Sequence, residues 1–355
     1  MEQQVESEAQ RYDRQIRVWG SEVQRKIQTS KILICGLGKV HIEVIKNIVL
    51  AGMNITIQSS REVDYNDLSY NFFVNDQSIH HNVADAMIHK IQELNNFVKV
   101  DIEKTAIDLL PDEFFLKYNV ILMTECTEQQ ALRVNHICRL STPSIVFFWS
   151  DIFGAEGIFY SDFGNDFHYQ EDKSQSKDSS NSTSSTTNGV SSSNTDSGSG
   201  NSSSLIKTLN FPSLSVILSK KWCDIPSRHF PLSKTFIKNR VITCFRDRYH
   251  RHPICHSKED QKNLQKILLS YQIDNDYCIN ISNVHASVTI DPFLTIDDII
   301  SVCNTSSSVS IITCSVVGSF LSQEIIKGIS CTGQPAFNVF VFSSEDLIAK
   351  AIPIY

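Results

Sequence analysis

An apolar run that ends in a glycine turn, close to the start of the chain, constrains the fold more than any other feature. Residues 31–36 are apolar after Lys31 and end at Gly36, which predicts a short buried strand. The turn at Gly36 and Gly38 leads into residues 42–51, whose apolar positions recur at helical spacing. Residues 54–58 then predict a second strand. A strand, a glycine turn, a helix and another strand in this order predict the opening of a doubly wound α/β sheet.

Strand and helix patterns alternate along the rest of the chain, which favours a mainly parallel sheet. The further expected strands cover residues 98–102, 119–123, 144–149 and 338–342. The expected helices cover residues 21–28, 82–95, 128–140, 231–245, 258–271 and 309–329. Residues 153–163, which contain two glycines, are expected to form strands that turn out of the sheet. The last helix is nearly apolar all round, so we expect its surface to need a partner.

A polar insert interrupts this pattern. Residues 173–204 hold fifteen serines and four threonines, and Val190 is their one sizeable hydrophobic residue. Such a composition cannot bury enough apolar surface to offset the entropy of ordering the chain, so we expect the insert to be disordered. The expected organisation is an N-terminal α/β part over residues 1–172, the insert over 173–204, a mixed and partly helical region over 205–300, and a return to the α/β domain over 301–355.

Composition argues against several classes of function. The net charge is −7, which does not suit a nucleic-acid surface based on bulk positive charge. No apolar run reaches the roughly 18 residues that a membrane span needs, and the acidic, polar start is unlike a signal peptide. None of the ten cysteines forms a C-x-x-C pair, so neither a zinc site nor a redox dithiol is indicated. We expect a soluble protein of the nucleus or the cytoplasm.

The glycine turn lacks two parts of a dinucleotide-binding fingerprint. That fingerprint needs glycines at positions 36, 38 and 41, and an acidic residue at the end of the second strand for the ribose hydroxyls. Here position 41 is His41, and the second strand is followed by Ser59 and Arg61. We expect His41 to crowd the contact between helix and strand, and Arg61 offers no acceptor to a ribose. The pattern indicates a nucleotide-type fold whose own pocket, at Gly36, Gly38, His41, Ser59 and Arg61, no longer binds nucleotide.

A segment before the first strand carries a more specific signal. Residues 12–20 read Tyr-Asp-Arg-Gln-Ile-Arg-Val-Trp-Gly, which resembles the N-terminal signature of the enzymes that activate ubiquitin and its relatives. The similarity continues over residues 31–38, 45–52, 94–100, 150–154 and 316–327. These segments cover most of the chain outside the insert and much of 205–300. The resemblance implies a Rossmann-like adenylation domain of the ThiF type.

Within that family, the chain resembles the small, non-catalytic subunits of the heterodimeric SUMO-activating enzymes. Active members carry acidic residues where this chain has Ser59 and Arg61, Asn where it has Asp67, and Arg where it has Tyr70. They also carry an Asp after the fourth strand, where residues 123–127 offer no clear equivalent. The acidic residues serve the ribose and Mg²⁺, and Asn and Arg hold the triphosphate. The resemblance therefore implies a subunit that binds no cofactor itself, while a large catalytic partner subunit binds ATP and Mg²⁺ and carries SUMO as a thioester.

Arg14 is the one catalytic residue that the resemblance implies. In the family, the first Arg of the N-terminal signature reaches across the dimer to the partner's ATP phosphates, and by motif position that residue is Arg14. A guanidinium is permanently charged and planar, so it suits the charge that develops on pyrophosphate. For Arg17 we expect a structural ion pair, and for Cys223 no catalysis, because the family places the thioester on the partner. The basic run 246–252 is expected to be a solvated loop.

Three alternatives fit the sequence less well. The corresponding subunit of the neddylation-pathway enzyme usually carries a much larger central insertion than the 71 residues from 205 to 275. A self-sufficient, homodimeric adenylyltransferase of the sulfur-carrier type is disfavoured by Ser59, Arg61 and Tyr70. A nicotinamide dehydrogenase would need Gly at position 41 and an acidic residue at 58–60.

Overall fold

The computed structural model describes residues 7–171, 206–220, 234–254, 256–274, 295–306, 310–345 and 348–354. The Ser-rich insert expected at 173–204 and the residue Cys223 lie outside these described residues. Within the described ranges, no helix is both long enough and apolar enough to cross a bilayer.

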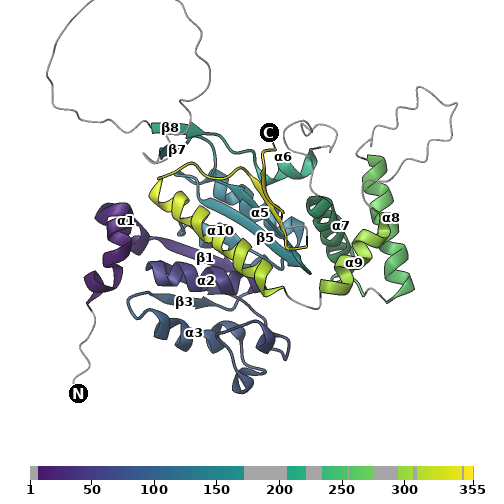
Figure 1. The fold of residues 1–355 in the computed structure, drawn as a ribbon, viewed down its shortest axis with the longest axis horizontal. Helices are drawn as coiled ribbons and strands as arrows, with labels where there is room; N and C mark the ends of the chain where they lie inside the picture. Colours follow the sequence, from purple (N-terminus) through teal and green to yellow (C-terminus); the bar gives the residue numbers. More distant parts are fainter. Residues whose placement is uncertain are drawn as a thin grey trace, which may run out of the picture.

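An eight-stranded sheet forms the centre of the molecule (Figure 1), with strand order β10-β9-β6-β5-β4-β1-β2-β3. Its strands are β1 (Lys31–Cys35), β2 (Asn54–Gln58), β3 (Val100–Glu103), β4 (Val120–Met123), β5 (Val146–Phe153), β6 (Glu156–Asp162), β9 (Val339–Ser343) and β10 (Ile348–Ile352). Five neighbouring strands, in the order β5, β4, β1, β2 and β3, run parallel to one another. The strands β6, β9 and β10 add an antiparallel part beside β5. The expected doubly wound, mainly parallel α/β fold is confirmed.

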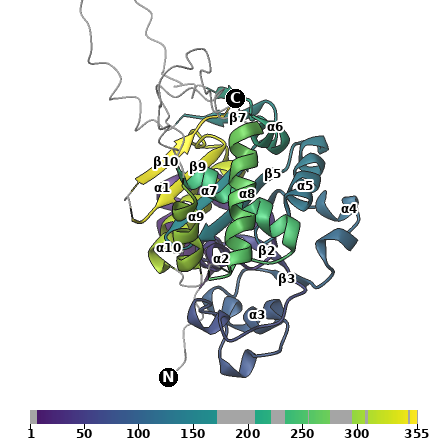
Figure 2. The same ribbon diagram turned by 90° about the vertical axis from the view of Figure 1, so that its right-hand side faces the viewer.

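Helices cover both faces of the sheet (Figures 1 and 2). One face carries α1 (Glu8–Thr29), α2 (Lys39–Ala51), α3 (Val83–Leu94) and α10 (Ile311–Ser330). The other carries α4 (Asp112–Phe115), α5 (Glu128–Leu140), α6 (Leu214–Ser219), α7 (Lys234–Tyr249), α8 (Lys258–Asp274) and α9 (Ile296–Ser306). Because successive strand residues point to opposite faces, Ile34 of β1 packs beneath α2 while Cys35 belongs to the opposite cluster.

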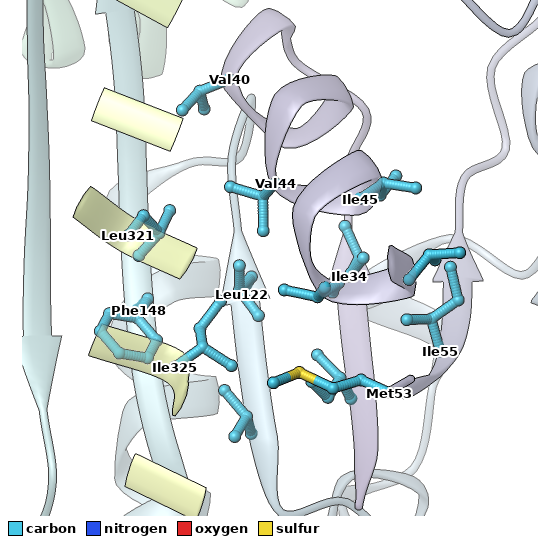
Figure 3. Close-up of a cluster of buried hydrophobic side chains, with 14 of the residues drawn as sticks. Ile34, Val40, Val44, Ile45, Met53, Ile55, Leu122, Phe148, Leu321 and Ile325 are labelled. Atoms are coloured by element: carbon cyan, nitrogen blue, oxygen red, sulfur yellow. The ribbon is translucent and has the colours of Figure 1, made fainter. Parts of the chain in front are cut away.

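The core beneath α2 and α10 holds these two helices against the sheet. Figure 3 shows Ile34 of β1, Leu122 of β4 and Phe148 of β5 packed against apolar side chains of both helices. Val44 of α2 and Leu321 of α10 are fully buried in the same cluster. The two helices therefore form one layer, which fixes the N-terminus of α2 above the carboxyl ends of β1 and β4.

The expectation that residues 153–163 leave the sheet is wrong. Phe153 of β5 pairs with Glu156 of β6, so β6 returns beside β5 in the same sheet. Gly154 adopts a positive φ of 64°, which allows this tight two-residue connection. Every residue of β6 is buried, because β5 and β9 pair along its two edges and the helices α10 and α7 contact it.

The first helix is much longer than the expected 21–28. Ser7 caps α1 and exchanges side-chain hydrogen bonds with Gln10, so the helix begins at Glu8. Gly20 interrupts it with φ 86° and ψ 161°, and the chain then continues as a second helical piece. The signature 12–20 is therefore helical up to a glycine kink, and the predicted helix was only its C-terminal part.

Several short elements were not expected from the sequence. They are α4, α6, α9, the edge strand β10, and a small antiparallel pair formed by β7 (Phe167–Gln170) and β8 (Ile206–Leu209). Both β8 and β10 have only four or five residues, and β7 pairs across the Ser-rich insert, so local periodicity does not identify them.

Candidate functional site

A cavity of about 690 Å³ lies at the carboxyl ends of β1, β4 and β5. Its lining includes Gly38 before α2, Glu125 after β4 and Asp151 of β5. Arg246 of α7 and His252 from the loop after that helix line it from the other layer. The sheet order reverses between β1 and β4, and a crevice at such a switch point is where doubly wound folds bind ligands. This is the site at which the sequence predicts a degenerate nucleotide pocket.

The two glycines of the turn are required by packing against the end of β4. Gly36 has φ 76°, and a Cβ on it would lie 2.4 Å from the carbonyl oxygen of Thr124. A Cβ on Gly38 would lie 2.9 Å from the Thr124 side chain. Packing against Thr124 therefore requires glycine at both positions, whether or not the turn binds a phosphate. Of the two, Gly38 lines the cavity.

His41 does not crowd the helix against the strand, as the sequence had led us to expect. It is fully buried, with Nδ1 3.2 Å from the carbonyl oxygen of Gly36 and Nε2 3.2 Å from Oγ of Ser150. A carbonyl only accepts, so Nδ1 donates to Gly36 and Nε2 accepts from Ser150. Burial lowers the pKa of His41 to about 4, so the ring is neutral at physiological pH. The imidazole thus joins the glycine turn to β5.

Arg61 is held inside the site by a carboxylate of its own chain. Its Nη1 and Nη2 donate to the two oxygens of Asp67, at 2.5 and 2.9 Å. The Tyr70 hydroxyl donates to Asp67 Oδ1 at 2.5 Å. Burial disfavours the charge on the fully buried Asp67, but these hydrogen bonds outweigh burial and hold the pKa of its carboxyl below the usual value. We refer to Arg61, Asp67 and Tyr70 as the Arg61 network.

The sequence flagged these three positions separately, as departures from an active site, and the structure brings them together. Ser59 lies beside the network: its Oγ accepts from the backbone N–H of Arg61 at 3.4 Å, and its side chain is buried. Ser59, Gly36 and His41 are not part of the cavity lining, whereas Arg61 and Tyr70 are.

Carboxylates also line the cavity, and one of them was missed. Glu125 lies two residues after the end of β4 and adopts φ 51°, a strained value for a residue with a side chain. It is exposed toward the cavity, yet desolvation by the surrounding protein raises the pKa of its carboxyl. The segment 123–127 therefore does place an acidic group at this edge. The position of Glu125 just past the end of a parallel strand was the available signal.

Asp151 is neutralised from the opposite helical layer. Arg246 Nη1 donates to Asp151 Oδ2 at 3.0 Å, and both side chains are nearly buried. Residues 246–249 belong to α7, so the expectation that the basic run from 246 begins a solvated loop is wrong. Burial disfavours the charge on Arg246, but the nearby carboxylate overrides this and raises the pKa of its guanidinium.

Comparison with known proteins decides the family. The ThiF family model matches residues 12–349. The chain belongs to the ThiF family. The SUMO-activating enzyme subunit 1 of Xenopus tropicalis is 30% identical over 345 residues, which are 96% of this chain and 94% of that protein. The subunit 1 proteins of Mus musculus and Homo sapiens are 30% and 29% identical, over 94% and 95% of this chain and 90% and 92% of their own lengths.

In this ThiF-family chain, Arg14 lies far from the chain's own cavity. Gln15, its neighbour in α1, donates to the carbonyl oxygen of Leu50 at the C-terminal end of α2. The cavity lies at the N-terminal end of that helix, whose 13 residues span about 20 Å. Arg14 is exposed, and no hydrogen bond or ion pair among the described residues holds its side chain. Arg17 pairs with Asp13 at 2.8 Å, as the sequence suggested.

Acidic and histidine side chains line the ThiF-family site, but in the described part of the chain they are not grouped as metal ligands. Among the residues that the structure describes, no cluster of three or more His, Cys, Asp or Glu side chains is arranged to hold one. The carboxylates Glu125 and Asp151 lie near the guanidinium groups of Arg61 and Arg246, which act on the pKa of Glu125. The two arginines of this cavity are thus paired with acidic groups of the same chain, while Lys39 lies over the ring of Tyr70.

Proposed function

We propose that this chain is the regulatory, non-catalytic subunit of a heterodimeric SUMO-activating enzyme. Support comes from 30% identity to a SUMO-activating enzyme subunit 1 over nearly the whole length of both chains. The holoenzyme would adenylate the C-terminus of SUMO and transfer it to a cysteine of the catalytic partner subunit. This chain would contribute architecture and one residue, Arg14, and would be found in the nucleus or the cytoplasm.

The Arg61 network is the observation that carries the non-catalytic assignment. A triphosphate needs unpaired cations and backbone donors. Arg61 already forms an ion pair with Asp67, and Arg246 forms one with Asp151. Glu125 adds a carboxylate that would face the phosphates. The residues of this cavity do not suit ATP and Mg²⁺, so we place both in the partner subunit.

Arg14 supplies the single catalytic contribution in this proposal. It is exposed and far from its own cavity, which suits a residue whose target lies on another chain. A guanidinium there would donate to the phosphates of the partner's ATP and stabilise the charge that develops as pyrophosphate leaves. Gln15 and the ion pair between Asp13 and Arg17 are engaged within their own chain and would keep the segment in place.

The test is reconstitution with the catalytic subunit of the SUMO-activating enzyme from the same organism. We expect a stable complex that catalyses ATP–pyrophosphate exchange with SUMO and forms the SUMO thioester. The isolated chain should show no exchange. Exchange by the isolated chain would identify a self-sufficient adenylyltransferase, and a complex formed with the neddylation-pathway catalytic subunit instead would identify the other alternative.

A further inference from the structure

Glu125 differs from the other carboxylates of the cavity in lacking a partner. Asp151 is paired with Arg246 at 3.0 Å, and Asp64 Oδ1 accepts two backbone N–H groups of its own turn at 2.8 and 3.0 Å. Among the residues that the structure describes, no donor forms a hydrogen bond or an ion pair with the carboxylate of Glu125. Glu125 therefore brings into the cavity a negative charge that no described neighbour pairs with.

The side chain of Glu125 lies against the glycine turn. A Cβ on Gly38 would lie 3.4 Å from Cγ of Glu125, and Gly38 is the residue that precedes α2. In doubly wound folds this turn and the first N–H groups of the following helix are where a phosphate binds. Gly38 and Val40 line the same cavity as Glu125, so an anion that reached the turn would lie beside this carboxylate.

Packing and stability do not explain a glutamate at this position. Its φ of 51° is one that glycine adopts freely and that a residue with a side chain adopts at a cost. The surrounding protein desolvates the carboxyl and thereby raises its pKa. A side chain that is strained, desolvated and unpaired, and that lines a cavity, is more readily explained by what it does in that cavity.

Glu125 also acts on the lysine at the start of α2. Lys39 lies over the ring of Tyr70, with its Nζ 5.6 Å from the ring centre. Burial lowers the pKa of Lys39, and the negative charges of Glu125 and Asp151 act in the opposite direction because they attract the ammonium. An anion at the turn would have to compete with Glu125 for this attraction.

We propose that Glu125 closes the glycine turn to phosphate groups, because its carboxylate takes the place of a bound anion and repels any other; this inference rests on the degenerate pocket of the proposed function. The ion pairs of Arg61 and Arg246 only withdraw cations from the cavity. Glu125 adds a like charge at the place where the phosphates would lie. Removal of this one carboxylate therefore gives the chain a site for an anion such as pyrophosphate.

The experiment is calorimetry of the full-length chain with inorganic pyrophosphate. The wild type should show no heat of binding at millimolar pyrophosphate. Glu125→Gly and Glu125→Gln should both bind it, with a Kd at least about tenfold below any value measurable for the wild type, since two like charges a few ångströms apart repel strongly. Glu113→Gln is the matched control, because Glu113 is exposed on α4, before the amino end of β4, and should behave like the wild type.

Thermal melting of the same variants tests whether the closure lowers stability. Glu125→Gly removes the strained φ and the desolvated charge together, so we expect its melting temperature to rise by about 1–4 °C. Glu113→Gln should leave the melting temperature unchanged. A lower melting temperature for Glu125→Gly would show that Glu125 stabilises the fold, which would contradict the proposal.

The outcomes separate this inference from the proposed function. Absence of pyrophosphate binding by folded Glu125→Gly would overturn it and leave the degenerate pocket intact. Binding by Glu125→Gly but not by Glu125→Gln would assign the closure to the bulk of the side chain and overturn the role of its charge. Binding by the wild type would instead reject the degenerate pocket itself. ATP should bind Glu125→Gly no more tightly than pyrophosphate does, because Ser59 and Arg61 replace the acidic acceptors of a ribose.

Discussion

Arg14 is an exposed cation whose neighbours in α1 are engaged with their own chain. Gln15 is bound to Leu50 of α2, and Arg17 is paired with Asp13 within the same helix. Side chains of this kind are usually free to vary, because a surface Arg contributes little to stability. Its significance in this chain therefore depends on the partner that it would reach.

Replacing Arg14 by Ala should leave the heterodimer assembled and slow adenylation. Loss of one charged donor to a phosphoryl-type transition state typically costs about 10² to 10³ in rate. Lys should restore activity only in part, since an ammonium lacks the planar fork. The measurement is ATP–pyrophosphate exchange with gel filtration of the complex, and Arg17→Ala is the control from the same helix. A normal exchange rate in an intact Arg14→Ala heterodimer would leave this chain with no catalytic role.

His41 makes the stability of the chain depend on pH. Folding lowers its pKa from 6.5 to about 4, so the unfolded chain binds the proton more readily. The stability contributed by the neutral ring is present above pH 6.5 and is lost as the pH falls toward 4. Between pH 7 and pH 5 the loss amounts to about 2 kcal/mol in the free energy of unfolding.

The check is urea unfolding at the two pH values for the wild type and for His41→Gln, whose side chain does not titrate. The variant should be less stable at pH 7 but should lose about 2 kcal/mol less than the wild type on acidification. Equal losses in both proteins would mean that another group sets the acid sensitivity.

The kink in α1 depends on Gly20. Gly20 has φ 86° and ψ 161°, a region open essentially to glycine alone, although a Cβ there would meet no atom within 4 Å. Gly20→Ala should therefore strain the backbone without a clash and lower the free energy of unfolding by about 1–3 kcal/mol. Ser21→Ala, one residue later, is the control and should change it by less than about 0.5 kcal/mol. Chemical denaturation measures both, and equal stabilities would show that α1 can straighten at no cost.

The pair β7–β8 explains why the insert should be dispensable. Gln170 pairs with Ile206, so the residues that flank the insert are strand neighbours about 5 Å apart. Replacing residues 174–203 by a short Gly-Ser bridge should leave the melting temperature and the activity of the heterodimer nearly unchanged, because closing a shorter loop costs no additional entropy. A large fall in either quantity would show that the insert folds or docks.

At the scale of the whole molecule, one prediction concerns the number of nucleotides. Calorimetry with the isolated chain and millimolar ATP and Mg²⁺ should show no heat of binding, since Arg61 and Arg246 are occupied by carboxylates. The heterodimer should bind one ATP, in the partner. Two nucleotides per heterodimer would contradict the degenerate pocket.

The assembly should also be obligate. An interface that covers α10 and reaches Arg14 would belong to the class that buries more than about 2,000 Å². We expect the isolated chain to aggregate or to melt well below the heterodimer, as ultracentrifugation and thermal melting of each can show. A stable, well-dispersed monomer at micromolar concentration would count against obligate pairing.

The sequence by itself determined the fold class and the family. Apolar runs such as 31–36 and 54–58, separated by a glycine turn and an amphipathic helix, admit few structures other than a doubly wound sheet. The signature at 12–20 and the absent nucleotide-binding residues were equally readable, because they depend on residue identity at positions close together in the chain.

Only the tertiary structure decided what the altered residues do. Ser59, Arg61, Asp67 and Tyr70 were recognised as losses, but the loop from 64 to 70 had to fold before Arg61 met a carboxylate. Asp151 meets Arg246 across 95 positions of sequence, and β6 stays in the sheet because β9 covers it. His41 fits where glycine was expected because Ser150 lies opposite. Periodicity and motifs report on neighbours in the chain, whereas the partner of a buried charge is chosen by contacts between distant segments.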